Sequence, residues 1–165
     1  MTSNSPLRHA LLSLTFVAAT AQAAATLAVK PLAREQVTAF GLARGFSAEA
    51  IAGYANACVL SFNFKNDRKM ALRFRLADWT AGDGVRLRPL KDWETEWEQR
   101  GVPSAARIAF RWAQFPAEQE FEAGDWIMGM AVPQRPIAGR FRITARYTDE
   151  KGNHELVSNT VTCAK

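Results

Sequence analysis

The sequence is poor in the residue types from which most active sites and metal sites are built. Its 165 residues include only two histidines and two cysteines. His9 lies in an N-terminal stretch that we expect to be removed, which leaves His154 as the single histidine. A Ser-His-Asp triad would have to use His154, yet this residue follows a turn and no nucleophile motif accompanies it. Zinc sites usually need several histidine or cysteine ligands, so the composition argues against a zinc protein as well.

The chain also lacks an apolar run long enough to cross a membrane. Residues 11–19 are mostly apolar, but a spanning helix needs about 20 such residues. This run follows a polar start that carries Arg8, and it precedes the small-x-small pattern Ala21-Gln22-Ala23. The pattern predicts a secretory signal peptide over residues 1–23 with cleavage near Ala23. We therefore expect a periplasmic or secreted protein without a transmembrane anchor.

The two cysteines, Cys58 and Cys163, both lie beyond the predicted signal peptide. An isolated pair of cysteines in an oxidising compartment usually forms a disulfide. The two are far apart in sequence and do not form a Cys-x-x-Cys motif, which argues against a thiol-redox role. Cys58 opens the first clear strand and Cys163 closes the last one. If those strands are antiparallel neighbours, the cysteines lie side by side, and we predict a Cys58–Cys163 disulfide.

Hydrophobic periodicity predicts a mainly β chain with a short helical start. Apolar residues follow a helical spacing between residues 31 and 57, so we assign residues 24–57 to an N-terminal helical segment. From Cys58 onward, apolar and polar residues alternate in several short runs that turns separate, a pattern typical of half-buried strands. About seven such strands favour an immunoglobulin-like antiparallel β-sandwich over residues 58–165. A small β-barrel is the alternative.

Two segments interrupt the series of strands. Residues 92–100 are expected to form a helix, because Trp93 and Trp97 have i, i+4 spacing. Alternation of Ile108, Phe110 and Trp112 predicts a strand over residues 107–113. The same region is open to a second interpretation, because Ile108, Trp112 and Phe115 would also share one face of a helix.

Met128-Gly129-Met130 suggests one metal-binding hypothesis. On a strand, the two methionines point to the same face. Thioethers are soft ligands that suit Cu(I), and His154 would add a nitrogen ligand. We therefore consider a copper site at Met128, Met130 and His154; the alternative is that both methionines fill gaps in the core.

Three tryptophans that each follow an aspartate suggest a carbohydrate site. An exposed indole stacks on the C–H face of a sugar, while a neighbouring carboxylate accepts hydrogen bonds from its hydroxyl groups. The candidates for such a platform are Trp79, Trp93 and Trp126. Packing of these indoles in the core or at its rim is the alternative.

Seven arginines fall on the outward phase of the predicted strands: Arg73, Arg75, Arg86, Arg88, Arg140, Arg142 and Arg146. If these strands share a sheet, the arginines form a basic face, while acidic residues cluster elsewhere, over 92–98 and 118–122. The planar guanidinium group suits interfaces, and complementary charge steers protein association. We predict a docking surface for another exported protein with an acidic surface. The alternative is a solvated sheet face with lateral ion pairs.

These observations favour an exported, non-enzymatic binding module that acts through protein–protein contacts, such as an accessory subunit, an inhibitor or an immunity-type protein. A periplasmic copper-binding protein and a carbohydrate-binding domain are the alternatives. The formal net charge of +5 is too diffuse to indicate nucleic acid. Apart from the copper hypothesis, no motif implies a cofactor. Glu118, Glu120 and Glu122 leave acid/base catalysis open, but their spacing identifies no glycosidase.

Overall fold

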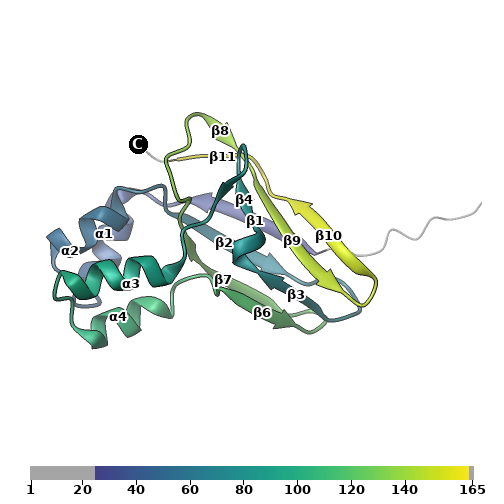
Figure 1. The fold of residues 1–165 in the computed structure, drawn as a ribbon, viewed down its shortest axis with the longest axis horizontal. Coiled ribbons are helices and arrows are strands. Elements are labelled where there is room, and N and C mark those ends of the chain that lie inside the picture. Colours follow the sequence, from purple (N-terminus) through teal and green to yellow (C-terminus); the bar gives the residue numbers. More distant parts are fainter. Residues whose placement is uncertain (1–24, 164–165) are drawn as a thin grey trace, which may run out of the picture.

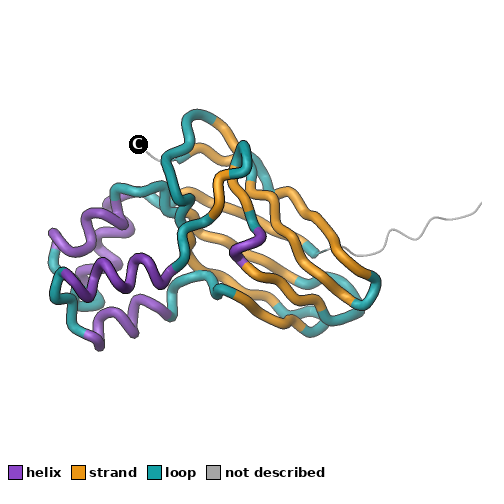
Figure 2. The backbone as a smooth tube through the Cα atoms, in the orientation of Figure 1, coloured by secondary structure: helices purple, strands orange, loops and turns teal. Residues whose placement is uncertain are grey.

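The computed structural model describes residues 25–163. The predicted signal peptide, with its cleavage site near Ala23, lies outside these residues. Figure 1 shows a β-sandwich with four α-helices gathered at one end, and the tube in Figure 2 shows that, apart from one short helical turn, the strands occupy the other end. None of the helices in the described residues is long and apolar enough to cross a membrane.

The first sheet of the sandwich has three antiparallel strands in the order β1-β2-β7. These strands are β1 (Thr26–Pro31), β2 (Leu60–Lys65) and β7 (Trp126–Ala131). The alternation in β2 turns Leu60, Phe62 and Phe64 inward, so that all three are fully buried against the opposing sheet. This alternation confirms the strand that the sequence predicts after Cys58.

The second sheet is built around the long strand β9, which has β10 on one edge and β3 and β4 on the other. β6 pairs with β3, β5 pairs with β4, and a short β8–β11 pair stands apart. The bounds of these elements are β3 (Leu72–Arg75), the 3-10 helix η1 (Leu76–Asp78), β4 (Thr80–Ala81), β5 (Val85–Arg86), β6 (Glu118–Phe121), β8 (Arg140–Phe141), β9 (Ile143–Asp149), β10 (Gly152–Val157) and β11 (Val161–Thr162). The sheets are open, so the fold is mainly β and sandwich-like, and the barrel alternative is wrong.

The core between the two sheets is rich in aromatic rings. Phe64 packs edge to face on Phe74 and on Trp79, with ring centroids 5.6 and 5.4 Å apart. Trp79 is fully buried, and its indole N–H donates to the carbonyl of Arg146 at 2.9 Å. Because its one polar atom is satisfied, this indole adds a large apolar area to the core without a desolvation cost.

A helical cap covers one end of the sandwich (Figure 1). It contains α1 (Arg34–Leu42), α2 (Ala48–Ala55), α3 (Leu90–Gln99) and α4 (Ser104–Arg111). Ser47 caps α2, because its hydroxyl accepts a hydrogen bond from the backbone N–H of Ala50 at 3.1 Å. The cap has its own core, in which Tyr54, Trp97 and Phe110 pack with centroids 5.0 to 5.6 Å apart.

Two parts of the predicted secondary structure are wrong. The strand expected over residues 107–113 is helix α4 followed by a turn, with Phe110 buried and Ile108 and Trp112 exposed. Residues two apart on a helix point about 200° apart, so an alternating pattern also fits a helix with one buried residue. The segment 24–57 is not wholly helical either, because it contains strand β1, whose Leu27 and Val29 point inward.

The predicted disulfide between Cys58 and Cys163 is confirmed. Cys58 lies just before β2, and Cys163 directly follows β11. The bridge therefore joins the first sheet to the last strand of the chain that the structure describes.

Candidate binding site

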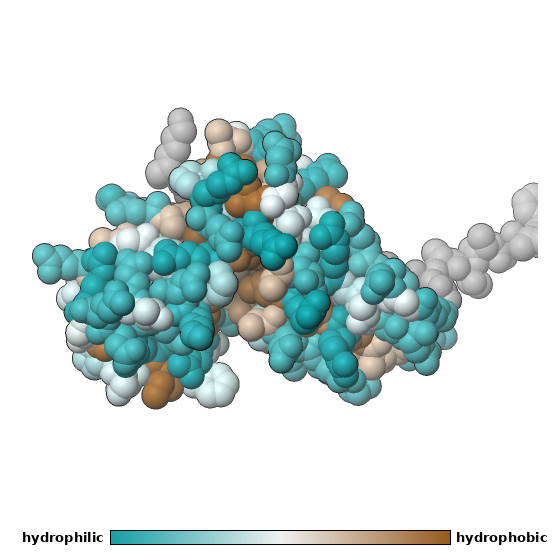
Figure 3. All heavy atoms as spheres, in the orientation of Figure 1, coloured by the Kyte–Doolittle hydropathy of each residue, from teal (hydrophilic) through white to brown (hydrophobic). Residues whose placement is uncertain are grey.

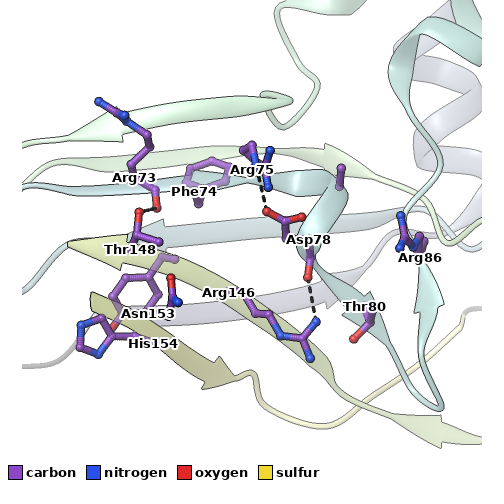
Figure 4. Close-up of a pocket in the computed structure, with 12 residues that line it drawn as sticks. Arg73, Phe74, Arg75, Asp78, Thr80, Arg86, Arg146, Thr148, Asn153 and His154 are labelled. Carbon is purple, nitrogen blue, oxygen red and sulfur yellow. Dashed lines mark hydrogen bonds and ion pairs between the residues drawn. The ribbon is translucent and has the colours of Figure 1, made fainter. Parts of the chain in front are cut away.

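The structure brings four of the seven predicted arginines to one hollow on the outer face of the second sheet. The hollow has a volume of about 570 Å³, and Figure 4 shows Arg73, Arg75, Arg86 and Arg146 around it. The other three arginines do not line it: Arg140 lies on β8, Arg142 donates to the Thr160 hydroxyl, and Arg88 stacks on Trp93. The predicted basic face is thus only partly assembled.

Acidic residues lie among these arginines. The nearest nitrogen–oxygen distances are 2.7 Å for Arg73–Glu120, 3.0 Å for Arg75–Asp78 and 3.2 Å for Arg146–Glu155. The expected segregation of charge is therefore wrong, because Glu118 and Glu120 lie on β6, directly opposite Arg75 and Arg73. Exposed pairs of this kind contribute little to stability, and this face is close to neutral.

The three candidate copper ligands do not meet. Met128 and Met130 lie on β7, an edge of the first sheet, whereas His154 lies on β10 in the second sheet. Met130 is buried in the core of the cap, as the core-packing alternative expects, while Met128 is 56% exposed. Across residues 25–163, no group of three or more His, Cys, Asp and Glu side chains is placed to hold a metal ion.

His154 instead belongs to a cluster at the β9–β10 hairpin. Its Nε2 lies 2.8 Å from Oδ1 of Asp149, and its ring stacks on Tyr147 with centroids 5.1 Å apart. Burial alone would raise the pKa of Asp149, but hydrogen bonds from His154 and the Lys151 backbone N–H, together with the charge of Arg68, lower that pKa. The cluster therefore holds a buried carboxylate in its charged form and fixes the hairpin.

Two of the three candidate sugar-binding tryptophans are buried. Trp79 and Trp93 are 0% and 5% exposed, because each packs among core aromatic rings, so neither presents a face to a sugar. Trp126 is 60% exposed on β7. The most exposed tryptophan, Trp112 at 85%, was not among the candidates.

Trp112 stands at a groove of about 690 Å³ between the helical cap and the sandwich. Figure 3 shows a hollow there, in which hydrophobic residues reach the surface. The lining is mainly apolar and comes from η1, from β5 and the chain after it, from the start of α3, from the end of α4 and the chain after it, and from β6 and β7. It includes Leu76, Leu87, Leu90, Trp112, Phe115, Ile127 and Met128. The volume falls in the range of ligand-binding clefts, and Trp112 and Met128 stand exposed at its edge.

The polar residues of the groove carry one sign of charge. They are the cations Arg86, Lys91 and Arg111 and the amides Gln114, Gln119 and Gln134. Arg111 pairs with Glu94 at 2.6 Å, whereas Arg86 and Lys91 form no ion pair with any described residue. None of the described residues that line the groove is Asp or Glu. The groove therefore combines an apolar floor with a positive rim.

The wall of the groove depends on a segment that crosses from the cap to the second sheet. Phe115 N donates to Met130 O, and Met130 N donates to Ala113 O, both at 2.8 Å. At Pro116 the chain leaves β7, and Ala117 O then accepts from Leu76 N at 2.7 Å. This path places Trp112 at the edge of the groove.

Gly129 allows the crossing segment to approach β7 closely. A Cβ atom on this glycine would lie 2.5 Å from Phe115 N and 2.7 Å from Gln114 O. Gln114 is held in turn by the Tyr54 hydroxyl, which donates to its Oε1 at 2.7 Å. Burial raises the pKa of Tyr54 well above its ordinary value, so the hydroxyl remains a donor.

No protein-family model and no curated protein matches this chain. The groove was also not predicted from the sequence, because its lining comes from segments that are far apart along the chain. One signal was present: Ile108 on α4 and Trp112, the residue that follows α4, lie opposite Phe110, and both are exposed.

Proposed function

We propose that this chain is an exported, non-enzymatic binding module that docks a segment of another protein in the groove between the helical cap and the sandwich. The observation that carries the proposal is the composition of that groove. Exposed Trp112 and Met128 lie beside a mainly apolar floor, under a rim where Arg86 and Lys91 have no ion pair within the described chain. Tryptophan, methionine and arginine are enriched in protein interfaces.

The charge of the rim indicates the chemistry of the partner. Cations beside a groove without carboxylates attract a segment that carries aspartate or glutamate. The apolar floor requires that the same segment bury apolar side chains. We therefore expect a partner segment in which acidic and apolar residues are mixed.

The finer fold assignment belongs to the same proposal. We infer an immunoglobulin-like sandwich, in which the loops and the inserted helices at one end carry the binding function. Support comes from the two facing antiparallel sheets and from the placement of all four helices at one end. The predicted signal peptide and the Cys58–Cys163 disulfide support an exported location.

Photo-cross-linking tests the proposed function. A benzophenone amino acid replaces Trp112, and the full chain is irradiated in the exported fraction of its own cells. The matched control carries the same group at Val157, which is 47% exposed on β10. We expect a cross-linked protein from the Trp112 position alone, attached through a segment that contains acidic residues.

Charge reversal provides the second readout. Arg86→Glu with Lys91→Glu should reduce cross-linking from Trp112 by about tenfold or more, because two attractive contacts become repulsive. Arg140→Glu, on β8 outside the groove, should leave it unchanged. Equal cross-linking from Trp112 and Val157, or cross-linking that is insensitive to reversal at Arg86 and Lys91, contradicts the proposal.

A further inference from the structure

We propose that the docked segment binds as an extra β-strand along the free edge of β7. This inference rests on the proposed function and states how the partner is held. It follows from the directions of the backbone groups in the first sheet.

In an antiparallel pair, successive residues direct their N–H and C=O groups alternately toward the partner strand and away from it. Both backbone groups of Met130 bond to the crossing segment, so they point away from β2. Met128 lies two residues earlier on the same strand, and its N–H and C=O therefore point to the same outer edge. Trp126, two residues earlier again, shares this direction.

The outer edge at Trp126 and Met128 has no protein partner among residues 25–163. β7 pairs only with β2, and the crossing segment bridges Met130 before it leaves at Pro116. No described side chain bonds to the backbone of Trp126 or Met128. An exposed, apolar strand edge is a template for the addition of another strand.

The opposite edge of the same sheet shows how such groups are covered elsewhere in the molecule. On β1, Val29 points its backbone groups away from β2. Asn159 fills this edge, since its Oδ1 accepts from Val29 N at 2.8 Å and its Nδ2 donates to Val29 O at 2.9 Å. The chain thus covers one edge of the sheet with a side chain and leaves the corresponding groups at Met128 open beside the groove.

Charge decides between a foreign strand and a second copy of this chain. A second copy would add its own β7, which contains no aspartate or glutamate to pair with Arg86 and Lys91, and it would bring a second positive rim to the contact, which disfavours self-association. An incoming strand with alternating residues would direct apolar side chains to the floor and acidic ones toward the rim. We commit to an extended, acidic segment of another protein as the occupant.

A proline substitution tests strand addition directly. In Met128→Pro the ring removes the N–H and fills the space along the outer edge, but it breaks no bond to β2 because this N–H points away from it. The matched control Met128→Leu keeps the N–H and an apolar side chain. The probes are fluorescent short peptides that alternate valine with glutamate, with valine–lysine peptides for comparison.

We expect the valine–glutamate peptide to bind the wild type, and to bind Met128→Pro at least about tenfold more weakly than Met128→Leu, because the two variants both lose the methionine side chain and differ in the backbone N–H. The valine–lysine peptide should not bind. Hydrogen exchange supplies a readout that needs no variant: the Met128 amide should exchange fast in the free protein and become protected when the acidic peptide is bound.

Three results would overturn the proposal: equal binding by the proline and leucine variants, no protection of the Met128 amide at saturating peptide, or no binding of the acidic peptide. Dimerisation that Met128→Pro abolishes would assign the edge to a second copy instead. If Trp112 cross-linking persists in Met128→Pro, the groove still docks a partner and only the strand geometry fails. If the benzophenone group at position 112 captures no protein in the otherwise unchanged chain, the proposed function itself is refuted.

Discussion

Replacing Gly129 with alanine tests the close packing that forms the wall of the groove. The added Cβ would lie 2.5 to 2.7 Å from three backbone atoms of Gln114 and Phe115, distances that real Cβ atoms do not show. No rotamer change can relieve this contact, because both sides are main chain. The crossing segment must therefore move away from β7.

The cost follows from the bonds that such a movement breaks. Two backbone hydrogen bonds, both 2.8 Å long, hold the crossing segment to Met130. Each contributes about 1 kcal/mol net, and a buried group left without a partner costs about 1 to 3 kcal/mol. Alanine in a strand regains about 0.5 to 1 kcal/mol over glycine. We expect Gly129→Ala to lower the free energy of unfolding by about 2 to 4 kcal/mol.

Urea unfolding followed by tryptophan fluorescence measures this change as a lower midpoint at an unchanged slope. Gly53→Ala is the matched control. Its Cβ would lie 3.3 Å from the Glu96 carboxylate and 4.0 Å from the Trp93 ring, both side chains rather than main chain, and alanine is favoured in a helix by about 1 kcal/mol. The same chemical change should thus stabilise α2 and destabilise β7. A Gly129→Ala protein as stable as the wild type would refute the packing argument.

The remaining predictions concern stability and its dependence on pH. Replacing Cys58 and Cys163 with serine opens a loop of 105 residues and should lower the free energy of unfolding by about 4 to 5 kcal/mol. Denaturation of the wild type and the variant without reductant measures this difference. The lowered pKa of Asp149 stabilises the fold above the ordinary carboxyl value near 3.8, and this contribution is lost as the pH falls below it; Asp149→Asn should flatten that part of a stability–pH profile. Phe110→Ala should cost about 3 to 5 kcal/mol, whereas Trp112→Ala should change stability by less than about 0.5 kcal/mol, because only Phe110 is buried.

Period-two alternation predicted most of the sandwich correctly, because one face of each strand meets the aromatic core. β2, β3 and β9 follow the expected phase, whereas burial in β7 does not alternate, because its last three residues are all buried. β1 was missed because it follows directly on an alanine-rich stretch of sequence, so its alternation is short. α4 was misassigned because a helix that buries Phe110 between exposed Ile108 and Trp112 has the alternation of a strand.

The candidate site was less predictable, for a different physical reason. The phase of a strand tells which residues point outward, and Arg73, Arg75 and Arg146 do share one face. It does not tell which strands become neighbours. β6 lies beside β3, so Glu120 pairs with Arg73 and Glu118 lies opposite Arg75, and the predicted basic surface is close to neutral. Predicting the groove also requires knowing which elements become neighbours, since η1, α4 and β7 meet only in the folded chain.

The position of the disulfide affects how the protein responds to proteolysis. Cys58 precedes β2 and Cys163 follows β11, so the covalent loop contains every strand of the described chain except β1. A protease that cuts once in any turn between them, such as the turn between β6 and β7, produces two fragments that remain joined. The nicked protein gains only the water of hydrolysis, and its fragments stay covalently joined until a reductant is added. Whether the protein stays one covalent molecule therefore depends on the oxidised state of Cys58 and Cys163 as much as on an unbroken backbone.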